Sequence, residues 1–208
     1  ILDSDIVENT FDYQIFKNMI ASIDIYIYGA AGDIDMKNNV RDKNMAENIF
    51  WYKKKHPKAK IIVWTANFHC AKCIKNIRYK EKEPKDYESN KLLGEYIAEH
   101  FKVYSVAFTS SEGNVLENMY GDSFHEIKAD KNTLEYHLSN RNFDFAFLDA
   151  KKMIEKDKSI INCNFNSLIL AYDNKPGQWF KSFDGIFYIK KNEPATYVYE
   201  WKFKIIIN

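Results

Sequence analysis

The densest group of residues that could do chemistry is His69 with the cysteine pair Cys70 and Cys73, just after an apolar run that ends at Trp64. The Cys-x-x-Cys spacing is that of half a zinc site or of a redox dithiol, and His69 could supply a third ligand. A zinc site normally needs a fourth ligand, and the remaining cysteine, Cys163, lies far along the chain. The alternative is a pair of small apolar thiols on a helix, which we favour, so we expect no metal and no other cofactor.

Two further polar groups have ordinary explanations. Asp122, His125 and Glu126 have a spacing that permits metal binding, but their surroundings are typical of a solvated loop. Asp149 ends a predicted strand, where its carboxylate could face a cleft or cap the following helix. The chain has no Gly-x-Ser-x-Gly elbow, no Walker-type phosphate loop and no His-Glu-x-x-His helix, which makes a serine hydrolase of the elbow type improbable.

The elements that must position these residues follow from the apolar periodicity. A helix is predicted from Asp5 to Ala30, with one buried face made of Phe11, Ile15 or Phe16, Met19, Ile20, Ile23 and Ile27. Strict alternation over 23–28 also fits a strand, although we favour the helix. The glycines in 29–33 predict a turn rather than a dinucleotide-binding loop. Further helices are predicted at Arg41–Lys54, ending before Pro57, and at 88–101 and 133–138.

The run from Lys60 to Thr65 is continuously apolar, which predicts a strand covered on both faces. Other strands are predicted at 103–108, 143–148, 167–171 and 186–190, with a terminal strand at 197–207. Their alternation with helices predicts a single α/β domain over residues 1–208, with a largely parallel sheet and helices on both faces. Ligands bind beyond the carboxyl ends of such strands, so a pocket is expected at 66–69, 109–114 and 149–151.

An ordered series of motifs gives the chain a resemblance to the erythromycin esterase family. The pair Arg41-Asp42 precedes Met-Ala-Glu-Asn at 45–48, and the predicted strand ends in Trp-Thr-Ala-Asn-Phe-His at 64–69, where the family has Trp-Ala-His-Asn-x-His. Further matches lie at Leu93-Gly94, 104–113, 133–138, 183–189 and 194–196, so the resemblance spans roughly Phe11 to Thr196 and predicts an erythromycin-esterase-like fold.

The resemblance implies a metal-independent bacterial hydrolase that opens a macrolide lactone or another ester, and antibiotic resistance is the family's label. In that family a histidine acts as general base on water, because an imidazole can take a proton near neutral pH. A nearby cation would stabilise the developing oxyanion. Carried over by position, His69 is the expected catalytic residue. The expected substrate contacts are Arg41, Asn67, Glu47 and Glu112.

Two departures from the family pattern bear on activity. Ala66, which has no ionisable group, stands where the family has its leading histidine, and the Gly-Glu-x-x-His-Gly-like motif of the family's N-terminal half has no match. The chain therefore resembles the C-terminal half of such a protein. Two hypotheses follow: histidine-assisted hydrolysis of an ester or lactone, which the loss at Ala66 would impair, or a non-catalytic module that binds a small molecule or a partner.

Composition limits the classes of partner. Lys and Arg number 30 against 29 Asp and Glu, so the basic excess of a dedicated nucleic-acid binder is missing. The basic run at 53–60 is expected at the solvated end of a helix. No apolar run is long enough to cross a membrane and no signal peptide is visible, which favours a cytoplasmic location, although the start at Ile1 allows for a trimmed targeting segment. The expected partner is a small-molecule ester or lactone.

Overall fold

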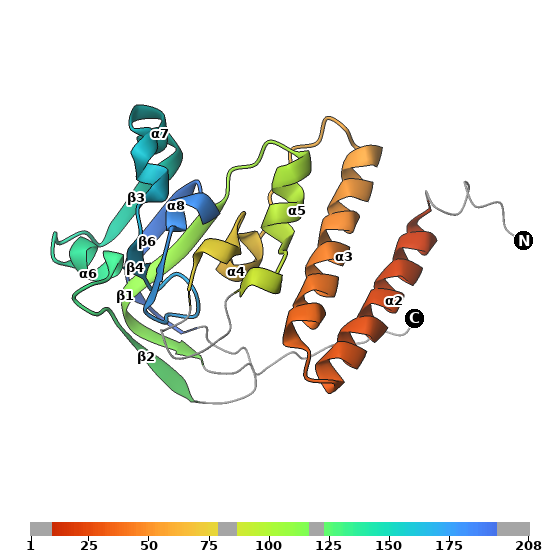
Figure 1. Cartoon of the computed structure of the whole chain (residues 1–208), viewed down its shortest axis with the longest axis horizontal. Coiled ribbons are helices and arrows are strands. Elements are labelled where there is room, and N and C mark those ends of the chain that lie inside the picture. Colours follow the sequence, from red (N-terminus) through yellow and green to blue (C-terminus); the bar gives the residue numbers. More distant parts are fainter. Residues whose placement is uncertain (1–9, 79–86, 117–122, 195–208) are drawn as a thin grey trace, which may run out of the picture.

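The structure, a computed structural model, describes residues 10–78, 87–116 and 123–194. Two long helices, α2 (Phe11–Ala30) and α3 (Ile34–Lys55), form a hairpin at one end of the molecule, and a sheet lies at the other end (Figure 1). Between them lie two shorter helices, α4 (Asn67–Cys70) and α5 (Leu93–His100). None of the helices in these ranges is long and apolar enough to span a bilayer.

The hairpin follows from local sequence signals. The Asp33 carboxylate accepts a hydrogen bond from the Met36 N–H at 3.0 Å and so caps α3, while Gly32 adopts φ 75° in the turn. The predicted helix up to Ala30 and the turn that follows it are confirmed for the described residues. The prediction that the apolar side of α2 is buried is wrong, because the buried residues of α2 are Gln14 and Ala21.

The main sheet has the order β2-β1-β6-β3, formed by β2 (Phe124–Lys128), β1 (Val106–Leu116), β6 (Gly185–Asn192) and β3 (Phe145–Asp149). Only β1 and β6 run parallel, while β1 pairs with β2 and β6 pairs with β3 in antiparallel fashion. The prediction of a largely parallel sheet is therefore wrong, and the fold is a mixed α/β one. The segment joining β1 to β2, residues 117–123, is too short for the crossover that a parallel pair needs.

Three segments also differ from the predicted strands and loops. The run Lys60–Thr65 belongs to no strand, and the side chains of Ile62 and Trp64 are 92% and 84% exposed. An apolar run indicates a buried strand only where neighbouring strands cover it, and the described residues provide none here. The segment 109–113, expected as a loop, lies inside β1.

The third difference concerns the predicted strand at 167–171. Only its first residue is in a strand, β4 (Phe165–Ser167), which pairs with β5 (Lys175–Gly177), and the chain then turns. The predicted strand at 197–207 lies outside the described residues. The predicted helix at 133–138 is confirmed as α6 (Leu134–Ser139), and the Asp149 carboxylate caps α7 (Ala150–Lys156) by accepting from the Lys152 N–H at 3.1 Å.

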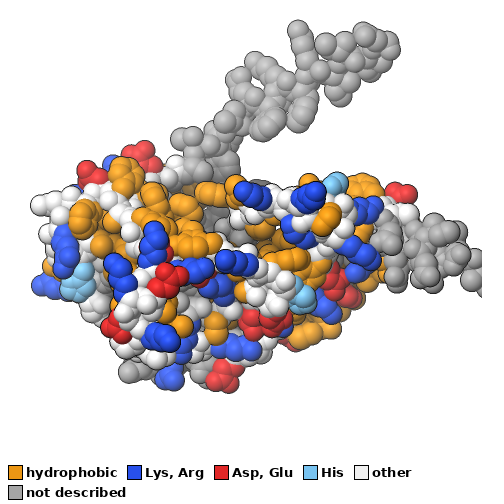
Figure 2. All heavy atoms as spheres, turned by 90° about the horizontal axis from the view of Figure 1, so that it is seen from above, with side chains coloured by type: hydrophobic (Ala, Val, Ile, Leu, Met, Phe, Trp, Pro, Cys, Tyr) orange, Lys and Arg blue, Asp and Glu red, His pale blue; other side chains and the backbone are white. Residues whose placement is uncertain are grey.

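The core lies between the sheet and the small helices, including α8 (Trp179–Ser182). Its fully buried large side chains include Trp179, Phe183 and Ile186. Short 3-10 turns at Ile74–Asn76, Tyr87–Ser89 and Lys158–Asn162 join these layers. On the face that Figure 2 shows, apolar side chains lie in patches between scattered Lys and Arg side chains, so apolar surface remains outside this core.

Candidate functional site

A fully buried carboxylate, that of Asp42 on α3, holds the imidazole of His69 on α4. Both Asp42 carboxylate oxygens lie 2.9 Å from Nδ1 of His69, and Oδ1 also accepts a hydrogen bond from the Leu93 N–H at 2.8 Å. An ionised carboxylate can only accept hydrogen bonds, so Nδ1 of His69 carries the proton. Nε2 is then the ring nitrogen whose lone pair can accept a hydrogen bond.

Arg41 closes this network on the other side of the ring. Its Nη2 donates a hydrogen bond to Nε2 of His69, so both ring nitrogens are engaged. The Nε–H of Arg41 is buried and has no hydrogen-bond partner among the described residues. Because this donor is buried, it can meet an anionic or carbonyl oxygen only if the groups around it move.

Helix packing explains how Asp42 reaches its position. Gly94 of α5 lies so close to α4 that a Cβ built on it would come 2.4 Å from the Cys70 carbonyl oxygen. This close approach brings the start of α5, with the N–H of Leu93, and the α4 side chain of His69 to the same carboxylate. The sequence match at Leu93-Gly94 therefore has a structural reason.

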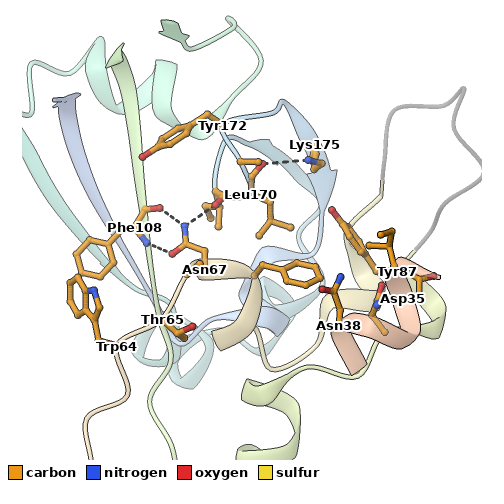
Figure 3. A pocket seen from close by; sticks show the side chains of 16 residues that line it. Asp35, Asn38, Trp64, Thr65, Asn67, Tyr87, Phe108, Leu170, Tyr172 and Lys175 are labelled. Atoms are coloured by element: carbon orange, nitrogen blue, oxygen red, sulfur yellow. Dashed lines mark hydrogen bonds between the residues drawn. The ribbon is translucent and has the colours of Figure 1, made fainter. Parts of the chain in front are cut away.

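A cavity of about 720 Å³ lies next to the network, and Figure 3 shows its wall. Phe68 lines the cavity, and its ring meets the His69 ring edge-on with centroids 5.3 Å apart. Asn38, one helical turn before Asp42 on α3, also lines it. Arg41 and His69 are not among the lining residues, so the network lies behind the cavity wall rather than in it.

Ala66 and Asn67 stand at the start of α4 and both line the cavity. The Asn67 Nδ2 donates to the carbonyl oxygens of Phe108 at 2.6 Å and Ile169 at 2.7 Å, and its Oδ1 accepts from the Phe108 N–H at 2.9 Å (Figure 3). These bonds use both donor hydrogens of the amide. Asn67, predicted to contact substrate, thus ties α4 to β1 and to the turn after β4.

That turn holds two consecutive residues in the left-handed region, Ala171 with φ 56° and Tyr172 with φ 59°, and both line the cavity. Neither residue type favours this conformation, and such strain persists where the surroundings enforce it, often at binding sites. A second buried carboxylate, Glu135, supports the start of this turn, because its Oε1 accepts from the Leu168 N–H at 3.0 Å. The same oxygen accepts from the hydroxyls of Thr109 and Ser167 at 2.7 and 2.5 Å. The sequence carries no signal for these roles of Ala171 and Tyr172.

Two predicted substrate contacts lie elsewhere in the structure. The Glu47 carboxylate is 2.5 Å from the ammonium group of Lys17, so it joins α3 to α2. Glu112 is exposed on β1 and pairs in register with Lys128 and Lys191 of the neighbouring strands. Neither residue lines the cavity. Of the predicted site residues, the structure brings together Arg41 and His69, with Asn67 beside the cavity.

Asp42 is the site residue that sequence reasoning left out of the expected contacts, although the Arg41-Asp42 pair was recognised as a motif. A signal was available in the sequence, since Asp42 stands three residues before Met45, which belongs to the predicted apolar stripe of this helix. The structure confirms that Asp42 is buried there, with Ala46. A carboxylate on the buried stripe of a helix needs a partner, which pointed to a cation or a hydrogen-bond donor inside the domain.

The thiol hypothesis finds no metal-binding group to support it. Cys70 and Cys73 are free thiols, and burial raises the pKa of the Cys70 thiol, which disfavours the reactive thiolate. Within the described residues no three His, Cys, Asp or Glu side chains are grouped so that they could hold a metal ion. His125 and Glu126 lie on β2 rather than in a loop, and Asp122 lies outside the described residues.

The fold recurs in solved structures of low sequence identity. A succinoglycan biosynthesis protein matches with a TM-score of 0.58 and 17% identity, over 92% of this chain and 52% of that chain. A protein from Bacillus cereus matches with a TM-score of 0.58 and 21% identity, over 93% and 54%. A variant of the erythromycin esterase EreC in its open conformation matches with a TM-score of 0.55 and 14% identity, over 80% and 41%.

The chain thus spans about half of the length of the solved structures that it matches. No curated protein matches it. The sequence pattern of the erythromycin esterase family does match, over residues 6–191, which is most of the chain. This match shows that the chain belongs to the erythromycin esterase family.

Proposed function

We propose that this chain acts in the hydrolysis of an ester or lactone, with the cavity beside Ala66 holding the substrate and the network behind it supplying the polar chemistry. The observation that carries the proposal is the chain of hydrogen bonds from Asp42 through His69 to Arg41. A buried carboxylate that orients an imidazole is the arrangement that general-base catalysis uses.

Because Arg41 and His69 lie behind the cavity wall, the proposed reaction needs this wall to open toward them. It also needs Arg41 to leave Nε2 of His69 and move to the oxygen of the substrate carbonyl. Nε2 then accepts a proton from water, the water oxygen bonds to the carbonyl carbon, and the carbonyl oxygen becomes an anion that the guanidinium stabilises. Collapse of this intermediate breaks the bond to the alkoxide, which takes the proton from His69. The products are a carboxylic acid and an alcohol, and Asp42 stabilises the imidazolium between the two steps.

A second candidate function is a binding module without catalysis. Two observations favour it: Ala66 provides no ionisable group at the cavity, and Nε2 of His69 is engaged by Arg41. In this case the aromatic wall of the cavity, which includes Trp64, Tyr87 and Phe108, would bind an apolar ligand.

The experiment that separates the two functions measures hydrolysis of a panel of simple esters and macrolide lactones, with binding of the same compounds measured by calorimetry. The wild-type chain is compared with His69→Ala and Ala66→His, and circular dichroism confirms that each variant is folded. Turnover by the wild type that His69→Ala loses supports the proposed hydrolysis. Binding without turnover in every variant rejects hydrolysis and supports the binding module.

A further inference from the structure

Helix α2 turns its polar side toward the domain. The Asn18 side chain meets two amides of α3, with its Oδ1 accepting from Nδ2 of Asn44 at 2.6 Å and from Nδ2 of Asn48 at 2.8 Å. Lys17 pairs with Glu47 on the same side. Amide and ion pairs therefore join α2 to α3, where an apolar seam would be expected for a helix of this composition.

The opposite side of α2 is apolar and exposed. Phe16, Ile20, Ile23 and Ile27 each leave between 54% and 63% of their surface in water, and Met19 beside them is 56% exposed. These four positions are separated by four, three and four residues, which is the a/d spacing of a coiled-coil seam. A continuous apolar stripe of this kind on a surface marks a site of association.

We propose that α2 is a dimerisation helix, and that two copies of this chain associate through the stripe of Phe16, Ile20, Ile23 and Ile27. Side chains at a and d positions of one helix pack between the a and d side chains of a facing helix, so a second α2 is a matching partner for this stripe. A helix of 20 residues is about 30 Å long, which gives room for nearly three heptads. The two α2–α3 hairpins would then form a four-helix arrangement.

The position and charge of α2 favour a second copy over a lipid surface. Helices that lie on membranes carry Lys and Arg beside their apolar face. The only basic residue of α2 is Lys17, and it is paired with Glu47. The hairpin stands at the end of the molecule opposite the sheet (Figure 1), so a partner on its outer side leaves the cavity open. The solved relatives are about twice as long as this chain, so a different polypeptide segment is the alternative that the test must separate.

The test measures the mass of the whole chain in solution by sedimentation over about 1 to 100 μM, a range in which micromolar dimers dissociate. The wild type is expected at twice the chain mass of 24.6 kDa. The variant Ile20→Glu/Ile23→Glu is expected to weaken the dimer by at least about 100-fold, because two central apolar anchors become charges. Both side chains are exposed in the monomer, so the fold is retained, which circular dichroism confirms.

The control is Ile62→Glu, which makes one of the same kind of substitution on a different exposed apolar segment and should leave the dimer intact. A wild type that stays monomeric at every concentration overturns the proposal and assigns the stripe to another polypeptide. A dimer that survives Ile20→Glu/Ile23→Glu, or that Ile62→Glu dissociates, overturns it too, because the contact would then lie elsewhere. The readout is mass, so the result is independent of the proposed hydrolysis.

Discussion

Replacing Asp42 by Asn tests whether the network is built as the hydrogen bonds indicate. The Asn oxygen can still accept from the Leu93 N–H, but its amino group then faces the Nδ1–H of His69, donor against donor. If His69 instead carries its proton on Nε2, this N–H faces the Nη2 donor of Arg41, so two donors still meet. Every tautomer leaves one donor without an acceptor, and the buried part of the Arg41 guanidinium loses its counter-charge.

The magnitude follows from these losses. Removing one partner of a buried charged pair costs about 3–5 kcal/mol, and His69 keeps some contact with solvent, so we expect a loss of about 2–4 kcal/mol in the free energy of unfolding. With a urea m-value of about 2 kcal/mol per molar, the unfolding midpoint falls by about 1–2 M. Urea titration followed by circular dichroism measures both the midpoint and the slope.

The matched control is the double variant Arg41→Met/Asp42→Asn. Without the guanidinium, His69 can carry its proton on Nε2, and the Asn amino group can donate to Nδ1, so the donor-against-donor contact is removed. The double variant should therefore be at least about 1 kcal/mol more stable than the sum of the two single changes predicts. A loss below about 0.5 kcal/mol in Asp42→Asn, or strict additivity in the double variant, would refute the reasoning.

Three further changes test other contacts. Asn67→Asp turns two hydrogen bonds to backbone carbonyl oxygens into repulsions and should cost about 2–4 kcal/mol in urea unfolding; a neutral result would contradict its role as a clamp. Gly94→Ala places a methyl group against the Cys70 carbonyl and should cost about 1–3 kcal/mol, whereas Gly29→Ala, which meets only a lysine side chain, should not destabilise. Burial raises the pKa of Glu135 in the folded state, so its contribution to stability is full below the unfolded pKa and is lost as the pH rises through the folded pKa. Thermal melts from about pH 4 upward should show this loss of stability with rising pH in the wild type but not in Glu135→Gln, whose side chain does not ionise.

Local signals predicted that helices form in the right regions, but not where α3 and α5 begin. The apolar period placed α2, and the glycines at 29–33 placed the turn that follows it. The second helix was predicted from Arg41 but begins at Ile34, where Asp33 caps it, and the Asp149 cap of α7 was one of two alternatives. The same period predicted the wrong buried side for α2, because it locates an apolar stripe but does not say what covers the stripe. The run at 60–65 failed for a similar reason, since apolar content predicts burial only if a neighbouring strand is present.

The candidate site was predictable in part. The motif resemblance located Arg41, Asn67 and His69, because chemistry restricts residue types at fixed positions. The roles within the group depended on contacts between distant segments, which spacing does not reveal. Asn67 has a side chain of the kind that often contacts ligands, but here its amide bonds to backbone carbonyl oxygens. Glu47 was predicted as a substrate contact from a motif, but its carboxylate pairs with Lys17.

The hydrogen bonds of Asn67 have a consequence for the order of folding. They join residues that are 41 and 102 positions apart, so the loops they close are among the costly ones in chain entropy. Contacts of this range form after local helices, which means that the cavity is assembled late. The amide hydrogen of Phe108 should accordingly exchange with solvent only through large-scale opening of the domain, at a rate that follows global unfolding rather than fraying of β1. A partly folded chain would keep its helices and lack the cavity.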